Sequence, residues 1–140
     1  MDEMMKKWLL MLCFVCVGAH AEFWQTVGGS DASELTIDTE SIKETSGIRE
    51  AWSMWNFSQP RVTNDNHFPA LKSYKDLQQY NCKDKTMRLT REIIYSDLDG
   101  KGQSQDHSDA LKNMQFSAPA AGSVGDAMLQ LVCGFQFKKK

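Results

Sequence analysis

The sequence lacks an excess of charge of either sign, and it lacks the motifs of the common enzyme classes. Its 16 lysines and arginines nearly balance 18 aspartates and glutamates, so it does not have the basic composition that attracts nucleic acids or anionic membranes. It contains no Gly-x-Ser-x-Gly, His-Glu-x-x-His or phosphate-binding glycine loop. After residue 21 only His67 and His107 remain as histidines, and neither has an evident second ligand nearby in the sequence. We therefore expect no enzyme activity, no metal and no cofactor.

One acidic stretch resembles the start of a calcium-binding loop. Asp97 and Asp99 have the spacing of the first two ligands. The fifth position of such a loop is here Lys101 and the twelfth is Ser108, where the motif requires an oxygen donor and a bidentate glutamate. We therefore interpret this stretch as a flexible acidic loop.

The sequence also lacks an apolar run of the 20 or so residues that a membrane-spanning helix needs. Its longest run, Trp8–Gly18, has the length of the apolar part of a signal peptide. Lys6 and Lys7 precede this run, and a small-x-small cleavage pattern ends at Ala21. The pattern predicts export, with cleavage between Ala21 and Glu22.

The predicted organisation is a signal peptide at residues 1–21 and one domain at residues 22–140. Cys13 and Cys16 lie inside the predicted signal peptide and would leave with it. A bacterial lipid-attachment cysteine follows a small residue, whereas a leucine and a valine precede these two. We therefore expect a protein of the periplasm or the cell surface that has no lipid anchor.

Two cysteines, Cys82 and Cys133, remain in the mature chain. Two cysteines in an exported domain more often pair than stay free, so we expect a disulfide, with two inert buried thiols as the alternative. Closing this loop would restrict the unfolded chain by about 4 kcal/mol. That is a large share of the net stability of a domain of this size.

Strand patterns cover most of the mature chain. Alternating apolar residues and intervening turn residues predict strands at Phe23–Val27, Leu35–Asp38, Ile48–Phe57, Leu71–Cys82, Thr86–Tyr95, Met114–Phe116 and Phe135–Phe137. The strand at 48–57 is apolar on both faces and is expected to be central. A helical turn is expected at 39–42, and loops at 59–69 and 97–109.

The strand at 86–95 has the cleanest alternation. It predicts one set of residues that faces inward, Met87, Leu89, Ile93 and Tyr95. It predicts a second set that faces outward, Arg88, Thr90, Glu92 and Ser96.

A short amphipathic helix is predicted at Ser123–Cys133. Ser123 and Asp126 have the spacing of a capping box, and Gly134 stands where a left-handed closing residue is usual. The predicted apolar stripe consists of Val124, Ala127, Met128, Leu131 and Val132.

The elements together predict an α+β fold. An antiparallel sheet of five to seven strands would pack one apolar face against the C-terminal helix. The disulfide would attach that helix to the sheet at the end of the segment Tyr80-Asn81-Cys82.

The order and spacing of several short motifs resemble the bacterial surface-adhesin protein E-like domain. They are Trp24-x-x-Val27, Ile37-Asp38-x-x-Ser41-Ile42, the strand around Trp52, Ser73-x-Lys75, Tyr80-Asn81-Cys82, the strand at 88–95, and Gly122-Ser123 leading to Leu131-Val132-Cys133. The resemblance implies a twisted antiparallel sheet with a disulfide-held C-terminal helix, in exported proteins of Gram-negative bacteria. It also implies adhesion to host matrix and serum proteins such as vitronectin and laminin. The chain departs from the family pattern at Asn81, where an aspartate is usual, and in the missing lipid-attachment cysteine.

The candidate binding residues form a basic run after Cys82, namely Lys83, Lys85, Arg88 and Arg91. The resembling adhesin is also basic here, so we predict that this run binds an acidic protein partner; a solvated hairpin without a ligand is the alternative.

The function predicted is that of a non-catalytic binding module. A periplasmic structural or accessory protein without a host ligand is the alternative. An unpaired edge strand would also allow a homodimer.

Overall fold

The computed structural model describes residues 22–63 and 67–139. The predicted signal peptide and the Ala21 side of its cleavage site lie outside the described residues. Within this part of the chain, the helix and the 3-10 turns are α2 (Val124–Gly134), η1 (Thr39–Ser41), η2 (Leu98–Gly100) and η3 (Ser108–Leu111). The strands are β1 (Trp24–Gly29), β2 (Ser33–Asp38), β3 (Lys43–Thr45), β4 (Ile48–Arg61), β5 (Leu71–Asn81), β6 (Thr86–Tyr95) and β7 (Ser104–Asp106).

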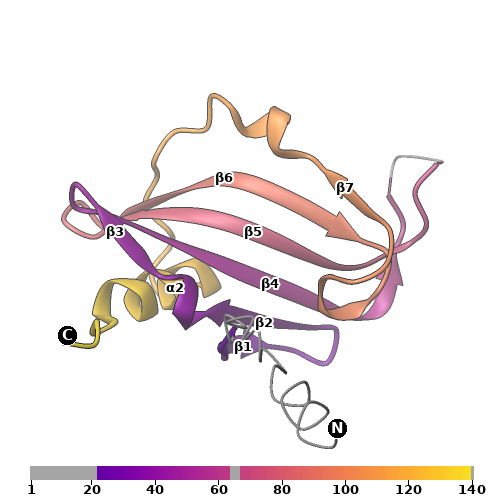
Figure 1. Ribbon diagram of the computed structural model, residues 1–140, viewed down its shortest axis with the longest axis horizontal. Coiled ribbons are helices and arrows are strands. Elements are labelled where there is room, and N and C mark those ends of the chain that lie inside the picture. The colour runs from indigo at the N-terminus through magenta and orange to yellow at the C-terminus, as the bar shows by residue number, and fades with distance from the viewer. Residues whose placement is uncertain (1–21, 64–66, 140) are drawn as a thin grey trace, which may run out of the picture.

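The strands form one antiparallel sheet in the order β1-β2-β4-β5-β6-β7, and β3 pairs with β4 beyond the end of β2 (Figure 1). The long strands β4, β5 and β6 lie at its centre, as expected from the two apolar faces of β4. Helix α2 packs against one face of this sheet. The α+β class, the antiparallel sheet with one C-terminal helix and the disulfide are therefore confirmed.

Several predicted boundaries are wrong. Strand β4 continues to Arg61, so the loop predicted from Gln59 begins later. Pro60 is tolerated there because the pairing of β4 with β5 is interrupted between Asn56 and Arg61, where no ladder hydrogen bond is needed. Strand β3 lies between the turn predicted at 39–42 and the strand predicted from Ile48, where no element was predicted, and β7 lies in the stretch predicted as a loop. The strands predicted at 114–116 and 135–137 do not form, and only an isolated bridge joins Met87 to Ser117.

A β-bulge in β6 overturns the predicted alternation of that strand. Leu77 pairs with Arg91 and the next residue of β5 pairs with Leu89, which leaves Thr90 as the extra residue. The Thr90 hydroxyl donates to the carbonyl oxygen of Leu77 at 3.0 Å. Because one extra residue reverses the side-chain parity, Ile93 shares a face with Arg91 and not with Leu89.

The start of α2 is as predicted. The Ser123 hydroxyl accepts a hydrogen bond from the Asp126 amide at 3.2 Å. The Asp126 carboxylate accepts from the amide of Gly122, one residue before the N-cap, at 3.0 Å, whereas in a full capping box it would accept from the amide of the N-cap residue itself. The predicted closing role of Gly134 is wrong, because Gly134 is the last helical residue and has no positive φ.

The buried stripe of α2 is rotated from the predicted one. Val124 is 44% exposed, whereas Leu129 is buried together with Met128 and Val132. The rotation turns Gly125 toward the sheet side, where an added Cβ would lie 3.1 Å from the Cβ of Pro119. The missing side chain at this position allows the close approach that seats the first turn.

Arg49 holds the C-terminal end of α2. Its Nη1 donates to the carbonyl oxygens of Val132 at 2.7 Å, Cys133 at 3.3 Å and Phe135 at 2.9 Å. Its Nε also donates to Glu44 at 3.2 Å, and the arginine side chain is only 15% exposed. The last carbonyls of a helix are unpaired and carry partial negative charge, so this cation stabilises the end of the helix.

Replacing Arg49 with methionine is expected to lower the free energy of unfolding by about 2 kcal/mol, because half-buried carbonyls lose their donor while the aliphatic bulk stays. Urea unfolding followed by circular dichroism measures the change. The matched control is Lys43→Met, which breaks an exposed ion pair with Glu50 and should cost less than about 0.5 kcal/mol. Equal losses in the two variants would contradict the role given to Arg49.

Candidate functional site

The face of the sheet opposite α2, here called the open face, carries aromatic and basic side chains. Cross-strand pairing places Trp52, Leu77 and Arg91 in one row across β4, β5 and β6. Lys75 and Ile93 form the next row toward the β6–β7 end. The bulge at Thr90 is what brings Arg91, Ile93 and Tyr95 to this face. The open face is therefore a product of strand register and not of local sequence alone.

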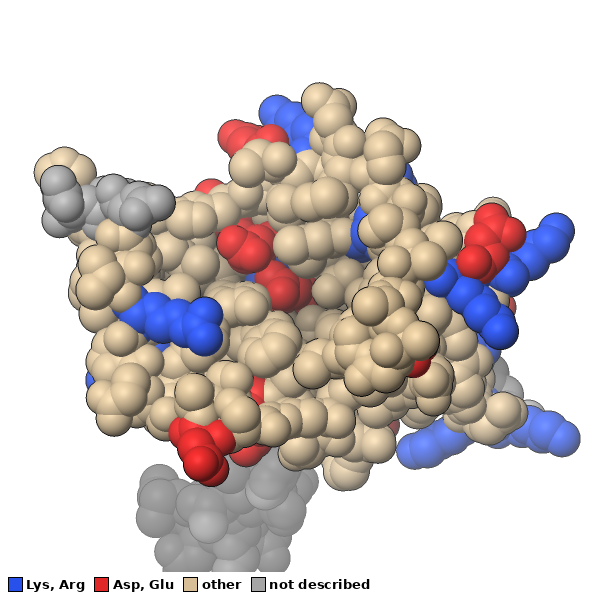
Figure 2. All heavy atoms as spheres, turned by 180° about the vertical axis from the view of Figure 1, so that it is seen from behind, with Lys and Arg blue, Asp and Glu red and all other residues tan. Residues whose placement is uncertain are grey.

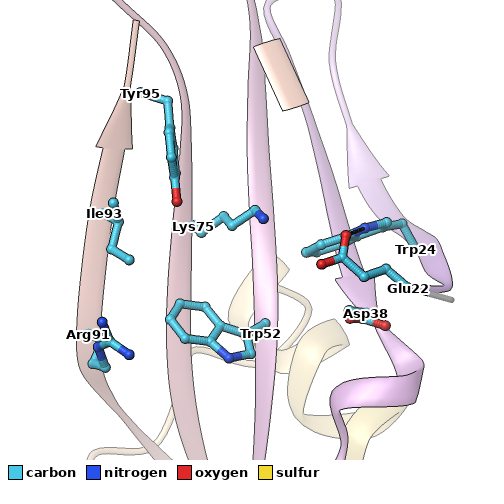
Figure 3. A pocket seen from close by; sticks show the side chains of 8 residues that line it. All are labelled: Glu22, Trp24, Asp38, Trp52, Lys75, Arg91, Ile93 and Tyr95. Carbon is cyan, nitrogen blue, oxygen red and sulfur yellow. Dashed lines mark hydrogen bonds between the residues drawn. The ribbon is translucent and has the colours of Figure 1, made fainter. Parts of the chain in front are cut away.

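These side chains line a depression of about 220 Å³. Figure 3 shows it from close by: residues of β4, β5 and β6 form one side, and the N-terminal segment with β1 forms the other. The lining residues are Glu22, Trp24, Asp38, Trp52, Lys75, Arg91, Ile93 and Tyr95. The shape and the rings suit a small protruding group of a partner rather than a deeply enclosed ligand.

Two cations in this depression lie against aromatic rings. The Nζ atom of Lys75 is 5.5 Å from the ring centroid of Trp24 and 6.0 Å from that of Tyr95. The guanidinium of Arg91 is 5.3 Å from the centroid of Trp52. These are cation–π distances, and each restricts a long, flexible side chain to the surface of a ring.

Gly100 of the 3-10 turn η2 lies against the outer end of the Lys75 side chain. A Cβ on Gly100 would lie 2.6 Å from Cε of Lys75, and Gly100 has a φ of +67°. The amide of Gly100 donates to the Ser73 hydroxyl at 3.0 Å, and the amide of Asp99 donates to Asn56 at 2.8 Å, so the turn is fixed to the sheet. The turn thus restricts the outer end of the Lys75 side chain on one side.

The carboxylates of the depression are already engaged by other groups. Glu22 accepts from the indole Nε1 of Trp24 at 3.1 Å, and Asp38 accepts from the amides of Phe23 and Glu40, both at 3.1 Å. Among the described residues, no carboxylate lies within ion-pair distance of Lys75.

Arg91 likewise lacks a strong carboxylate partner. Its one ion pair in the described chain is a 3.5 Å contact with Asp106, and both of these side chains are about half exposed. The pKa of the Asp106 carboxyl is lowered, chiefly by its hydrogen bonds with Ser108 and then by Arg91. The depression therefore presents two cations, Lys75 and Arg91, to an incoming anionic group.

The described residues contain no cluster of three or more metal-ligating side chains. His107 lies 2.7 Å from the side-chain oxygen of Gln105, in the edge region around β7 and η3. Within the same part of the chain, no helix has the length and apolar character needed to cross a membrane.

Comparison with known proteins assigns the family. A sequence model described as "Surface-adhesin protein E" matches residues 24–134. The chain belongs to the surface-adhesin protein E family. No curated protein matches it significantly.

Solved structures of family members share the fold. Crystal form II of Haemophilus influenzae protein E is 16% identical, with a TM-score of 0.60 over 71% of this chain and 80% of that one. A second structure of this protein has a TM-score of 0.57 at 16% identity, over 71% and 76% of the two chains. The structure of protein E from non-typeable Haemophilus influenzae has a TM-score of 0.57 at 16% identity, and the match covers 71% of this chain and 69% of that one. At this identity the likeness is one of fold.

The predicted basic run does not form a single patch in this adhesin E family member. Lys83 and Lys85 are exposed in the turn between β5 and β6. Arg88 donates to Gln79 at 2.8 Å and stacks on the ring of Phe116 at 4.5 Å, near one end of the open face. Only Arg91 lines the depression.

Sequence reasoning missed three important residues of this site. Trp24 and Lys75 enter the sequence analysis only as parts of family motifs, and Tyr95 only as a residue predicted to face inward on its strand. A usable signal is present for Lys75, since it is two residues from Leu77 and therefore on the same face of β5. Trp24 could not be found this way, because it reaches the site from β1, which β2 separates from β4.

Proposed function

We propose that this member of the surface-adhesin protein E family is an exported, non-catalytic binding protein that recognises host matrix or serum proteins through its open face. The observation that carries the proposal is the pair of cations, Lys75 and Arg91, held against aromatic rings without a strong carboxylate partner. Family membership supports a surface adhesin-like binding role. Arg88, together with Lys83 and Lys85 in the adjacent turn, would extend the basic surface.

The chemistry of the depression favours an acidic side chain next to an apolar one. Lys75 and Arg91 can bind a carboxylate, while Trp24, Trp52 and Ile93 supply apolar contact area. Aromatic and arginine side chains often dominate the binding energy of protein interfaces. The proposal therefore places the strongest contacts in the depression and weaker ones around it.

Binding to immobilised vitronectin and laminin tests the proposal. The purified domain 22–140 should bind at least one of them saturably, and the affinity should fall as salt rises, because charged contacts contribute. Serum albumin, which is also acidic, is the control for nonspecific attraction. Failure to bind either protein would leave the host-binding role unsupported.

A periplasmic accessory protein without a host ligand is the second candidate. Protease treatment of intact cells distinguishes the two roles, because an adhesin is cleaved and a periplasmic protein is protected.

Analytical ultracentrifugation of the purified domain 22–140 tests for the homodimer, since β1 and β7 are edge strands that could pair with a second copy.

A further inference from the structure

A pair of carboxyl groups, one buried and the other half-buried, lies on the helix-bearing face of the sheet. Asp76 of β5 and Glu92 of β6 are direct cross-strand neighbours. Asp76 is only 5% exposed. Figure 2, which looks onto this face, shows acidic side chains gathered in a hollow over the middle of the sheet. Two adjacent carboxyl groups of this kind repel each other when both are charged, so they require a proton or a cation between them.

Two polar atoms at this place have no partner in the described chain. They are Oδ1 of Asp76 and the hydroxyl of Tyr80, whose side chain is fully buried. Tyr80 and Asp76 project from the same face of β5, four residues apart. The charge of Asp76 contributes, after burial, to the raised pKa of Tyr80, which places the phenol within electrostatic reach of the carboxyl. A buried polar atom without a partner is costly, so both atoms are available to a bound group.

Aromatic rings form the other wall of this region. Tyr74 lies two residues from Asp76 on the same strand face, and its pKa is raised by burial and then by the charges of Asp76 and Glu92. Its ring centroid is 6.1 Å from that of Trp55 and 5.5 Å from that of Phe57. The arrangement therefore combines two carboxyl groups and two phenols with ring faces, which is the chemistry of sites for organic cations.

We propose that the Asp76–Glu92 pair, with the hydroxyl of Tyr80 and the rings of Tyr74 and Trp55, is a binding site for a primary alkylammonium group. The three N–H donors of an ammonium match the three acceptors offered by Asp76, Glu92 and Tyr80. A metal ion fits less well, since the described residues here supply only two carboxylates. The ammonium can come from a free diamine or from a lysine side chain of a protein.

Binding at this site releases a proton. Burial, together with the charge and hydrogen bond of Glu92, raises the pKa of Asp76 to about 8, so near neutral pH the free site holds a proton that the ammonium displaces. The charged or titratable groups that face Asp76 are Glu92 on β6 and Tyr74 and Tyr80 on β5, with Arg61 of β4 acting on Tyr74. Affinity for an ammonium should therefore rise as the pH rises through about 8.

Isothermal titration calorimetry of the domain 22–140 tests the proposal with two probes, 1,5-diaminopentane and acetyl-lysine methylamide. Acetyl-norleucine methylamide, which lacks the charge, is the matched probe control. Binding of the diamine identifies a free amine as the ligand, and binding of the lysine derivative identifies a protein side chain; either supports the site. Titrations at pH 7 in two buffers of different ionisation enthalpy should show proton release by the wild-type protein.

Three near-isosteric variants locate the site. Asp76→Asn and Glu92→Gln should each weaken binding at least about tenfold, and Tyr80→Phe about threefold. Asp109→Asn makes the same chemical change at an exposed aspartate and should bind as the wild type does. Thermal melting of each variant verifies folding. The proposal is overturned if neither probe binds at about 10 mM, which is on the order of the dissociation constant of a weak amine site. It is also overturned if binding releases no proton and survives Asp76→Asn.

Discussion

Replacing both Cys82 and Cys133 with alanine is expected to lower the free energy of unfolding by about 4 kcal/mol. The two cysteines of the disulfide are 51 residues apart, and the segment between them contains β6, β7, the long connection to α2 and most of α2 itself. Without it the unfolded chain gains the conformational freedom of that whole segment. The native structure loses the covalent attachment of α2 to the sheet, so that only the buried face of the helix and Arg49 would then hold it.

Urea unfolding of the double variant, followed by tryptophan fluorescence and circular dichroism, measures this loss. Wild-type protein treated with a reductant should unfold at the same urea concentration as the untreated double variant. The reductant should not shift the double variant further. A loss below about 1 kcal/mol would mean that α2 packs against β1, β4 and β5 without needing the disulfide.

The second large effect is a loss of stability with rising pH that depends on Asp76. In the unfolded chain this carboxyl ionises at its ordinary pKa of 3.8, whereas in the folded protein burial and Glu92 raise the pKa to about 8. Between these values the folded state binds a proton that the unfolded state has released, so stability falls as the pH rises. At 1.36 kcal/mol per pKa unit, the loss between pH 4 and pH 8 is on the order of 5 kcal/mol.

Asp76→Asn removes this dependence, because an amide does not ionise. The variant should therefore gain stability relative to the wild type as the pH increases from 4 to 8, and the difference should stay constant above that. Chemical unfolding at intervals of one pH unit measures it, with Asp109→Asn as the exposed control. Parallel curves for the wild type and Asp76→Asn would show that Asp76 is ionised in the folded protein at neutral pH.

Local sequence was sufficient to predict the elements whose signals lie within a few residues. The cap at Ser123, the short strands β1 and β2, and the long strands β5 and β6 all depend on such signals. The disulfide followed from the cysteine count and the predicted compartment. The rotation of α2 was not predictable, because it depends on the approach of Gly125 to Met87 of β6, which is distant in the sequence.

The functional faces were harder to predict because they depend on register between strands. The bulge at Thr90 forms against Leu77 of the neighbouring strand, and no feature of β6 alone indicates it. Without the bulge, Arg91 and Arg88 are assigned to opposite faces. With the bulge, both arginines lie on the open face, and Glu92 becomes the cross-strand neighbour of Asp76 on the helix-bearing face.

The most direct test of the binding surface compares two charge-reversed variants for affinity to immobilised vitronectin and laminin. One variant reverses Lys75 and Arg91 in the depression, and the other reverses Lys83 and Lys85 in the exposed turn. Loss of two held cations from an interface centre predicts at least about a tenfold weaker affinity, and loss of two exposed charges less than about threefold. Full binding by the Lys75→Glu, Arg91→Glu variant, with binding lost in the Lys83→Glu, Lys85→Glu variant, would contradict the assignment of the open face.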